Sequence, residues 1–131
     1  MQTSQPRSLY ERLGGYDAIA TATDDLLGRL LGDPDLAVYF KGKSRDSLRK
    51  DRQLIVDFLV EAAGGPAYYC GRDMKTSHAG LGISDREWEI FMRHTRAMLA
   101  HLAVPQGESQ EVLGFLESLK TEVVQPQAVP V

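Results

Sequence analysis

Apolar residues recur with the spacing of one helical face in four long stretches of the chain: residues 16–31, 46–63, 85–102 and 109–124. Shorter helices are expected at 9–13 and 34–40, where Ser8 and Asp33 are suitable N-caps. No stretch alternates apolar and polar residues as a strand would. The pattern predicts one all-α domain over residues 8–124, with flexible tails at 1–7 and 125–131.

Each long helix is expected to bury one stripe of side chains, and glycine or proline follows several of the predicted ends. The predicted stripes are Ile19, Thr23, Leu26, Leu27, Leu30 and Leu31; Leu48, Ile55, Phe58, Leu59 and Ala62; Trp88, Phe91, Thr95, Met98 and Leu102; and Val112, Phe115, Leu116, Leu119 and Val123. Ser84 and Glu87 form a predicted capping box at the start of the third helix.

The segment between the second and third long helices carries His78, one of three histidines. Gly71 precedes this polar segment, and Gly80 and Gly82 follow it. Because glycine adopts backbone angles that other residues avoid, the segment is expected to be a short element held between two turns. A histidine held in this way is compatible with a metal ligand, a general base or a packed structural residue.

Composition narrows the function classes. The formal net charge of −3 gives no electrostatic basis for nucleic-acid binding. The single cysteine, Cys70, excludes an internal disulfide and a cysteine-rich metal site, and it is expected to be a small packing residue. No apolar run is long enough to span a membrane, and the N-terminus has no signal-peptide core. A cytoplasmic protein is therefore expected.

The sequence gives little support for a zinc site or for a catalytic site built on a nucleophile and a histidine. His94 and His101 lie seven residues apart, and together with His78 they form no zinc motif. No nucleophile elbow accompanies His78. Haem needs only one protein ligand for its iron, and the aromatic residues Phe40, Phe58, Trp88 and Phe91 are suited to line its pocket. From these patterns alone, a structural histidine and a haem ligand both stay open.

Several motifs, in order along the chain, resemble those of the group I truncated haemoglobins. They are Leu-Tyr-Glu-Arg-Leu-Gly-Gly at 9–15, Tyr39-Phe40, Phe58-Leu59 with Gly64-Gly65-Pro66 after it, the run from Tyr69 to His78 with Met74 four residues before the histidine, and Val104-Pro105. The resemblance covers residues 8–124. It implies the two-over-two helical sandwich of truncated globins, with a short F segment and a bound haem b.

By this resemblance, His78 is the proximal ligand and bonds the haem iron through Nε2. Phe40 packs against the haem face, and Phe58 and Leu59 belong to the distal helix. Met74, Phe91 and Lys75 are expected at the haem as well, Lys75 as one possible partner of a propionate. Arg72, Arg45 and Arg49 are alternative propionate partners.

The expected distal side departs from the family. Many members carry a tyrosine that donates a hydrogen bond to oxygen, and the equivalent position here is Leu27. Members often have glutamine or histidine on the distal helix, where this chain has Asp51, Leu54 and Ile55. Gln53 would enter only if that helix were rotated. Since a donor stabilises oxygen by about 1.5 kcal/mol or more, the resemblance predicts weak oxygen retention, an apolar distal pocket and a five-coordinate iron.

The leading hypothesis is therefore a haem protein that reversibly binds oxygen, carbon monoxide and nitric oxide. The alternatives are a nitric oxide dioxygenase or peroxidase-type enzyme, which would need a separate reductase or peroxide, and a haem-based gas or redox sensor. A haem-free globin is disfavoured because His78 and Phe40 are both present. The expected assembly is a monomer or weak dimer without nucleic-acid or membrane partners.

Overall fold

The computed structural model describes residues 7–124, and all regular structure within that range is helical. The predicted flexible tails lie, except for Arg7, outside the described residues. The helices are α1 (Leu9–Leu13), α2 (Tyr16–Leu31), α3 (Pro34–Ala37), the 3-10 helix η1 (Val38–Phe40), α4 (Arg45–Ala62), α5 (Met74–His78), α6 (Asp85–His101), α7 (Gln106–Ser118) and α8 (Lys120–Val123). The all-α prediction is confirmed.

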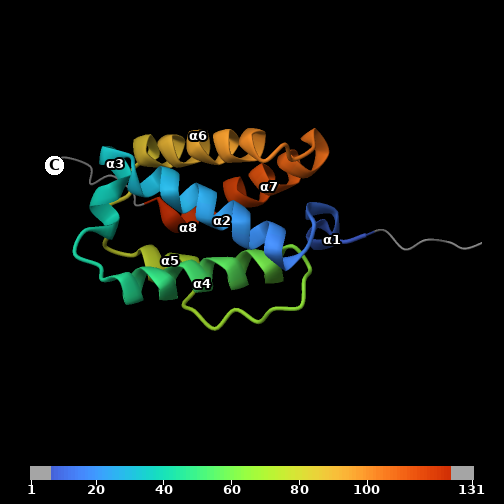
Figure 1. Ribbon diagram of the computed structural model, residues 1–131. Coiled ribbons are helices and arrows are strands. Elements are labelled where there is room, and N and C mark those ends of the chain that lie inside the picture. Colours follow the sequence, from blue (N-terminus) through green and yellow to red (C-terminus); the bar gives the residue numbers. More distant parts are fainter. Residues whose placement is uncertain (1–6, 125–131) are drawn as a thin grey trace, which may run out of the picture.

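The long helices form two antiparallel pairs, α2 with α4 and α6 with α7 (Figure 1). Helix α2 packs against both α4 and α6 and so joins the pairs. The chain leaving α4 doubles back along that helix before it enters α5, and α5 contacts α8. This is the two-over-two arrangement, and the segment between the pairs contains only the very short helix α5.

Local capping sets the starts of the helices as the sequence predicts. Ser8 caps α1 and Asp33 caps α3, and each side chain accepts a backbone N–H of the first turn. Ser84 and Glu87 form the predicted capping box of α6. Ser44 caps α4 in the same way, which explains why this helix begins one residue earlier than expected.

The last predicted helix, 109–124, was wrong in extent and continuity. Helix α7 begins at Gln106, directly after Pro105, whose fixed φ and missing N–H suit a helix start. It ends at Ser118, and α8 follows after Leu119. The amide of Leu119 bonds the carbonyl of Leu116 at 2.9 Å, a three-residue spacing that tightens the backbone and separates the two helices.

The buried face of α4 also differs from the predicted stripe. Val56 and Val60 are fully buried, whereas the predicted residues are half-buried, apart from exposed Ala62. The valines pack with Ile19 and Ala20 of α2. The side of α4 that faces α2 is therefore the one with Val56 and Val60. The predicted stripe lies beside this contact and is only partly covered. In α2, Leu31 is exposed rather than buried.

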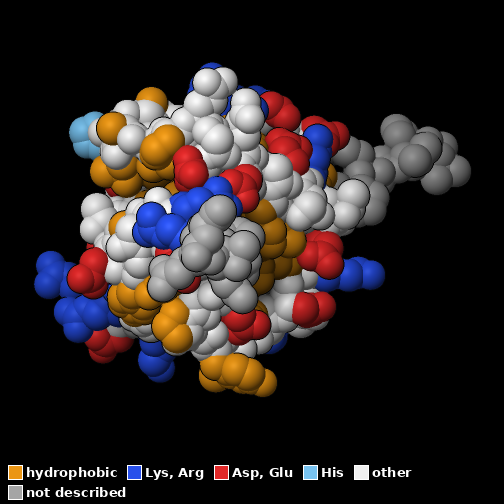
Figure 2. All heavy atoms as spheres, turned by 90° about the vertical axis from the view of Figure 1, so that its right-hand side faces the viewer, with side chains coloured by type: hydrophobic (Ala, Val, Ile, Leu, Met, Phe, Trp, Pro, Cys, Tyr) orange, Lys and Arg blue, Asp and Glu red, His pale blue; other side chains and the backbone are white. Residues whose placement is uncertain are grey.

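The surface mixes charges of both signs. Figure 2 shows acidic and basic side chains interspersed over one face of the molecule, with hydrophobic side chains between them. Among the described helices, none is long and apolar enough to cross a membrane. Cys70 is exposed, so its expected packing role was wrong. It lies in the loop before α5, next to Tyr68, which is 81% exposed.

Candidate functional site

The segment that carries His78 is a single helical turn, α5, with a defined start and end. The carboxylate of Asp73 accepts the Thr76 amide at 3.1 Å and caps the turn. Hydrogen bonds with the side chain and the amide of Thr76 lower the pKa of Asp73. Gly80 and Gly82 follow with φ of +80° and +70°, angles that a side chain would disfavour. The predicted short element held between turns is confirmed.

The imidazole of His78 is oriented by its own turn. Its Nδ1 lies 2.9 Å from the Met74 carbonyl oxygen and 3.0 Å from Oγ of Ser77. Because a carbonyl can only accept, Nδ1 carries a proton, and the lone pair of the neutral form of the ring is on Nε2. This is the tautomer in which a neutral histidine binds a metal through Nε2, with its other nitrogen held by a carbonyl.

Apolar residues from three parts of the chain adjoin this turn and join two core clusters. Met74 and Phe91 pack against the cluster built on Trp88, Met92, Leu116 and Val123. Phe91 also packs against a second cluster, which includes Leu26, Leu30 and Ile90 and to which Leu27 and Phe40 contribute. Phe91 thus links the α5 side of the fold to Leu27 and Phe40.

The predicted residues of α4 divide between two surroundings. Phe58 contacts Tyr69 edge-on at a centroid distance of 5.2 Å and lies 5.8 Å from Phe115 of α7. Leu59 packs instead with the buried valines of α4 and with α2. Leu54 and Ile55 are half-buried, and Lys75 on α5 is exposed. The fold therefore brings Phe58 toward α7, whereas Leu59 faces the helix pair.

The polar candidates on α4 are engaged with other residues. Asp51 forms an ion pair with Lys43 at 2.6 Å. The amide of Gln53 donates to the hydroxyl of Tyr16 at 2.7 Å and to the carboxylate of Asp57 at 3.0 Å. Gln53 is therefore directed to the N-terminal end of α2.

The other two histidines lie outside this region. Nε2 of His94 is 2.7 Å from the carboxylate of Asp33, and Nε2 of His101 is 3.8 Å from that of Asp25. Within the described part of the chain, no group of three or more histidine, cysteine, aspartate or glutamate side chains is placed to hold a metal ion. A metal bound at His78 would therefore need its remaining ligands from a cofactor.

The wall beside α5 contains one unusual polar atom. Trp88 is 3% exposed, and its Nε1 is the only buried side-chain nitrogen or oxygen without a hydrogen-bond partner in the described range. An unpaired buried donor costs about 1–3 kcal/mol. A single imidazole whose Nδ1 is held by a carbonyl, in a turn whose Met74 packs on an apolar and aromatic cluster, fits the one-ligand requirement of haem.

Three of these features were not predicted from the sequence: the Asp73 cap, the contact between Ser77 and His78, and the unpaired nitrogen of Trp88. The first two could have been predicted, since Asp73 is a typical N-cap residue five positions before His78 and Ser77 directly precedes it. The unpaired Trp88 nitrogen could not, because it depends on packing among α5, α6 and α7.

Comparisons with known proteins agree with this arrangement. The model of the bacterial-like globin family matches residues 8–125. A group 1 truncated haemoglobin of Mycolicibacterium paratuberculosis is 32% identical over 125 residues, which cover 95% of this chain and 90% of the relative. Another, from Chlamydomonas moewusii, is 33% identical over 121 residues, which cover 91% of this chain and 69% of the relative. The ferric truncated haemoglobin from Tetrahymena pyriformis shares the fold, with a TM-score of 0.83 at 23% identity over 92% of this chain and 100% of that one.

Proposed function

Because the chain belongs to the group I truncated haemoglobins, within the bacterial-like globin family, we propose that it binds haem b through Nε2 of His78 and reversibly takes up oxygen, carbon monoxide and nitric oxide. The observation that carries this proposal is the 2.9 Å contact between Nδ1 of His78 and the Met74 carbonyl. Haem supplies an iron that binds diatomic gases, and the chain holds and surrounds it.

His78 acts as the proximal ligand in this proposal, and its turn prepares it for that role. The Met74 carbonyl holds Nδ1 and so fixes the tautomer and the orientation of the ring. Met74, Phe91 and Phe40 supply apolar contacts from α5, α6 and η1. Lys75, exposed one turn before His78, is assigned to a haem propionate, because a lysine binds a carboxylate as a point charge.

The gas-facing side is proposed to be apolar, with Leu27, Leu54 and Ile55 in the positions where relatives carry donors. The tyrosines support this. The hydroxyls of Tyr10, Tyr16, Tyr39 and Tyr69 are all hydrogen-bonded to protein groups elsewhere, and Tyr68 is 81% exposed. Without a donor, oxygen is held less tightly than carbon monoxide, which gains less from hydrogen bonding.

A five-coordinate ferrous state is proposed because neither of the other two histidines lies near His78 as a second ligand for the iron. His94 and His101 lie on α6, beside Asp33 and Asp25. Gln53 and Asp51 have partners at other sites. These four side chains would therefore not compete with a gas for a bound haem iron.

An absorption spectrum of the reconstituted protein tests the proposal. We expect a Soret band, a five-coordinate spectrum in the deoxygenated ferrous form, and loss of tight haem retention in His78→Gly. Added imidazole should restore the spectrum of His78→Gly, whereas His101→Ala, at a largely exposed histidine, should match the wild type. Absence of a Soret band from the reconstituted wild type, or an unchanged spectrum in His78→Gly, would refute the proposal.

A further inference from the structure

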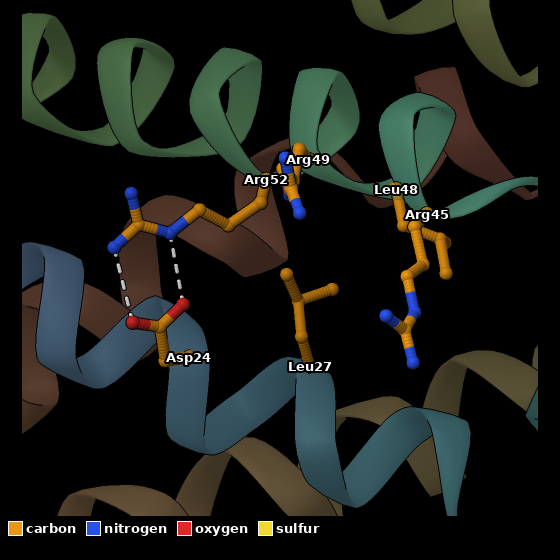
Figure 3. Close-up of a pocket in the computed structure, with 6 residues that line it drawn as sticks. All are labelled: Asp24, Leu27, Arg45, Leu48, Arg49 and Arg52. Carbon is orange, nitrogen blue, oxygen red and sulfur yellow. Dashed lines mark hydrogen bonds and ion pairs between the residues drawn. The ribbon is translucent and has the colours of Figure 1, made fainter.

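An open cavity lies between α2 and the first half of α4. Its volume is about 460 Å³, and it is lined by Asp24, Leu27, Arg45, Leu48, Arg49 and Arg52. Figure 3 shows Leu27 near its centre, between the arginine side chains of α4. Volumes of this size are typical of sites for small organic molecules.

The charges of the cavity are unbalanced. Arg52 is satisfied, because its guanidinium forms two hydrogen bonds with the Asp24 carboxylate, at 2.8 and 3.0 Å. Arg49 has only a loose pair with Asp46, at 3.7 Å between two exposed side chains. Arg45 has no ion pair or side-chain hydrogen bond within residues 7–124. Two guanidinium groups therefore stand beside the cavity with no firm carboxylate partner.

The position of these arginines in α4 adds to the imbalance. Arg45 is the first residue of α4, where the helix dipole favours negative rather than positive charge, and Arg49 lies one turn later on the same side. A bound anion would relieve this repulsion. Guanidinium groups bind carboxylates in two-point geometry, and Leu27 and Leu48 supply an apolar surface beside them.

The cavity faces away from Leu54 and Phe58, two of the α4 residues assigned to haem, although Leu27 borders both regions. Arg45, Arg49 and Arg52 follow one another at spacings of four and three and form one stripe of the helix. Leu54 lies two residues beyond Arg52, roughly 200° further around the helix axis. In agreement, Arg52 bonds Asp24 of α2, whereas Phe58, one turn after Leu54, contacts Phe115 of α7.

We propose that this cavity binds the carboxylate of a small acid with an apolar body, with Arg45 and Arg49 as its anchors and Leu27 and Leu48 as its apolar floor. The carboxylate has two conceivable sources, a free organic acid or a propionate that reaches across from the haem. The site stands on the cavity and its charges, so it does not require His78 to be the iron ligand.

Benzoate is a suitable probe, because it joins a carboxylate to an apolar ring. It is titrated at constant ionic strength into the full chain, loaded either with haem or with haem dimethyl ester, while backbone amide signals are followed by NMR. We expect saturable shifts at Leu27 and Leu48. The double variant Arg45→Ala/Arg49→Ala should weaken binding at least about tenfold, the loss expected for one charge-assisted contact. Lys50→Ala, an exposed lysine of the same helix that does not line the cavity, should change it less than about twofold.

The two loaded forms separate the two sources. Saturable binding to both means that the site takes a free acid, and binding to the ester-loaded form alone means that a haem propionate fills it. Either result supports the site. No saturable shift in either form, or equal affinity in the double variant and the wild type, would overturn it. If the chain takes up no haem, the same titration is run on the purified chain, so failure of the proposed function and failure of this site are distinguishable. Thermal melting verifies that the double variant is folded, and Arg45→Ala alone replaces it if it is not.

Discussion

Leu27 is the residue whose chemistry bears most on gas binding in the proposed function. It is half-buried on α2, packs against the cluster that includes Phe40 and Phe91, and forms part of the arginine-lined cavity on its other side. A leucine at this place supplies shape without a donor. The neighbouring polar residues do not compensate, since Gln53 and Asp51 bond elsewhere.

Leu27→Tyr should add the missing donor. A hydrogen bond to a charged or strongly polarised acceptor contributes about 1.5–3 kcal/mol, so oxygen dissociation should slow by roughly tenfold or more. Stopped-flow measurement of oxygen release would detect this, and carbon monoxide release should change less. Leu27→Phe adds the ring without the hydroxyl and should leave oxygen release close to the wild type. Equal slowing in both variants would show that bulk, not hydrogen bonding, is responsible.

At the scale of single elements, helix α1 is held close to the end of α4 and to the start of α2. The amide of Tyr10 in α1 bonds the carbonyl of Ala63 at the end of α4 at 2.8 Å, and the Tyr10 hydroxyl accepts the Tyr16 amide of α2 at 3.1 Å. Gly65 lies under the Tyr10 ring: a Cβ at this position would be 2.3 Å from Cδ1 of Tyr10. Gly65 is thus required by its contact with α1, whereas Gly64 is favoured by its φ of +91°.

Gly65→Ala should therefore destabilise the protein by about 1–3 kcal/mol, because the added methyl group forces the Tyr10 ring or the backbone to move. Gly28→Ala is the matched control, since a Cβ at Gly28, inside α2, has no neighbour within 4 Å. It should stabilise by about 1 kcal/mol through helix propensity. Urea unfolding of the two variants should give shifts of opposite sign. A neutral Gly65→Ala would contradict the packing argument.

At the scale of the whole molecule, hydrogen-bonded pairs of acidic and basic side chains join helices that are distant in sequence. Asp24 and Arg52 link α2 to α4, Asp33 and His94 link α3 to α6, and Glu111 and Arg12 link α7 to α1. The partners lower the pKa of Asp24, Asp33 and Glu111, chiefly through their hydrogen bonds. Two of the three pairs involve arginine, and Asp33 also caps α3.

These lowered pKa values predict the pH dependence of stability. A carboxylate whose folded pKa lies below its unfolded value of about 4 adds stability above that value and loses it as pH falls through the folded pKa. The free energy of unfolding should therefore decline below about pH 4. Asp33→Asn keeps a good N-cap but removes the charge, so it should be less stable than wild type near neutral pH and converge with it in acid. Glu89→Gln, at an exposed residue of α6, is the control, and its free energy of unfolding should change with pH as that of the wild type does. A constant difference between Asp33→Asn and wild type at every pH would contradict this.

The sequence determined the features that depend on neighbours along the chain. The bounds of α1 and α2, the Ser8, Asp33 and Ser84 caps and the isolated turn around His78 follow from local hydrogen bonding and helical periodicity, and the structure confirms them. The family resemblance was confirmed by comparison. The assignments of Phe40, Leu54 and the other site residues to haem stay predictions.

Tertiary structure decided what depends on partners distant in sequence. Periodicity defines an apolar face only to within about one residue's rotation, so packing on α2 selected Val56 and Val60 rather than the predicted stripe of α4. The break at Leu119, the unpaired nitrogen of Trp88 and the arginine-lined cavity arise in the same way. Each depends on which helices meet and at what rotation, and such contacts are set by burial over the whole fold rather than by any local run of residues.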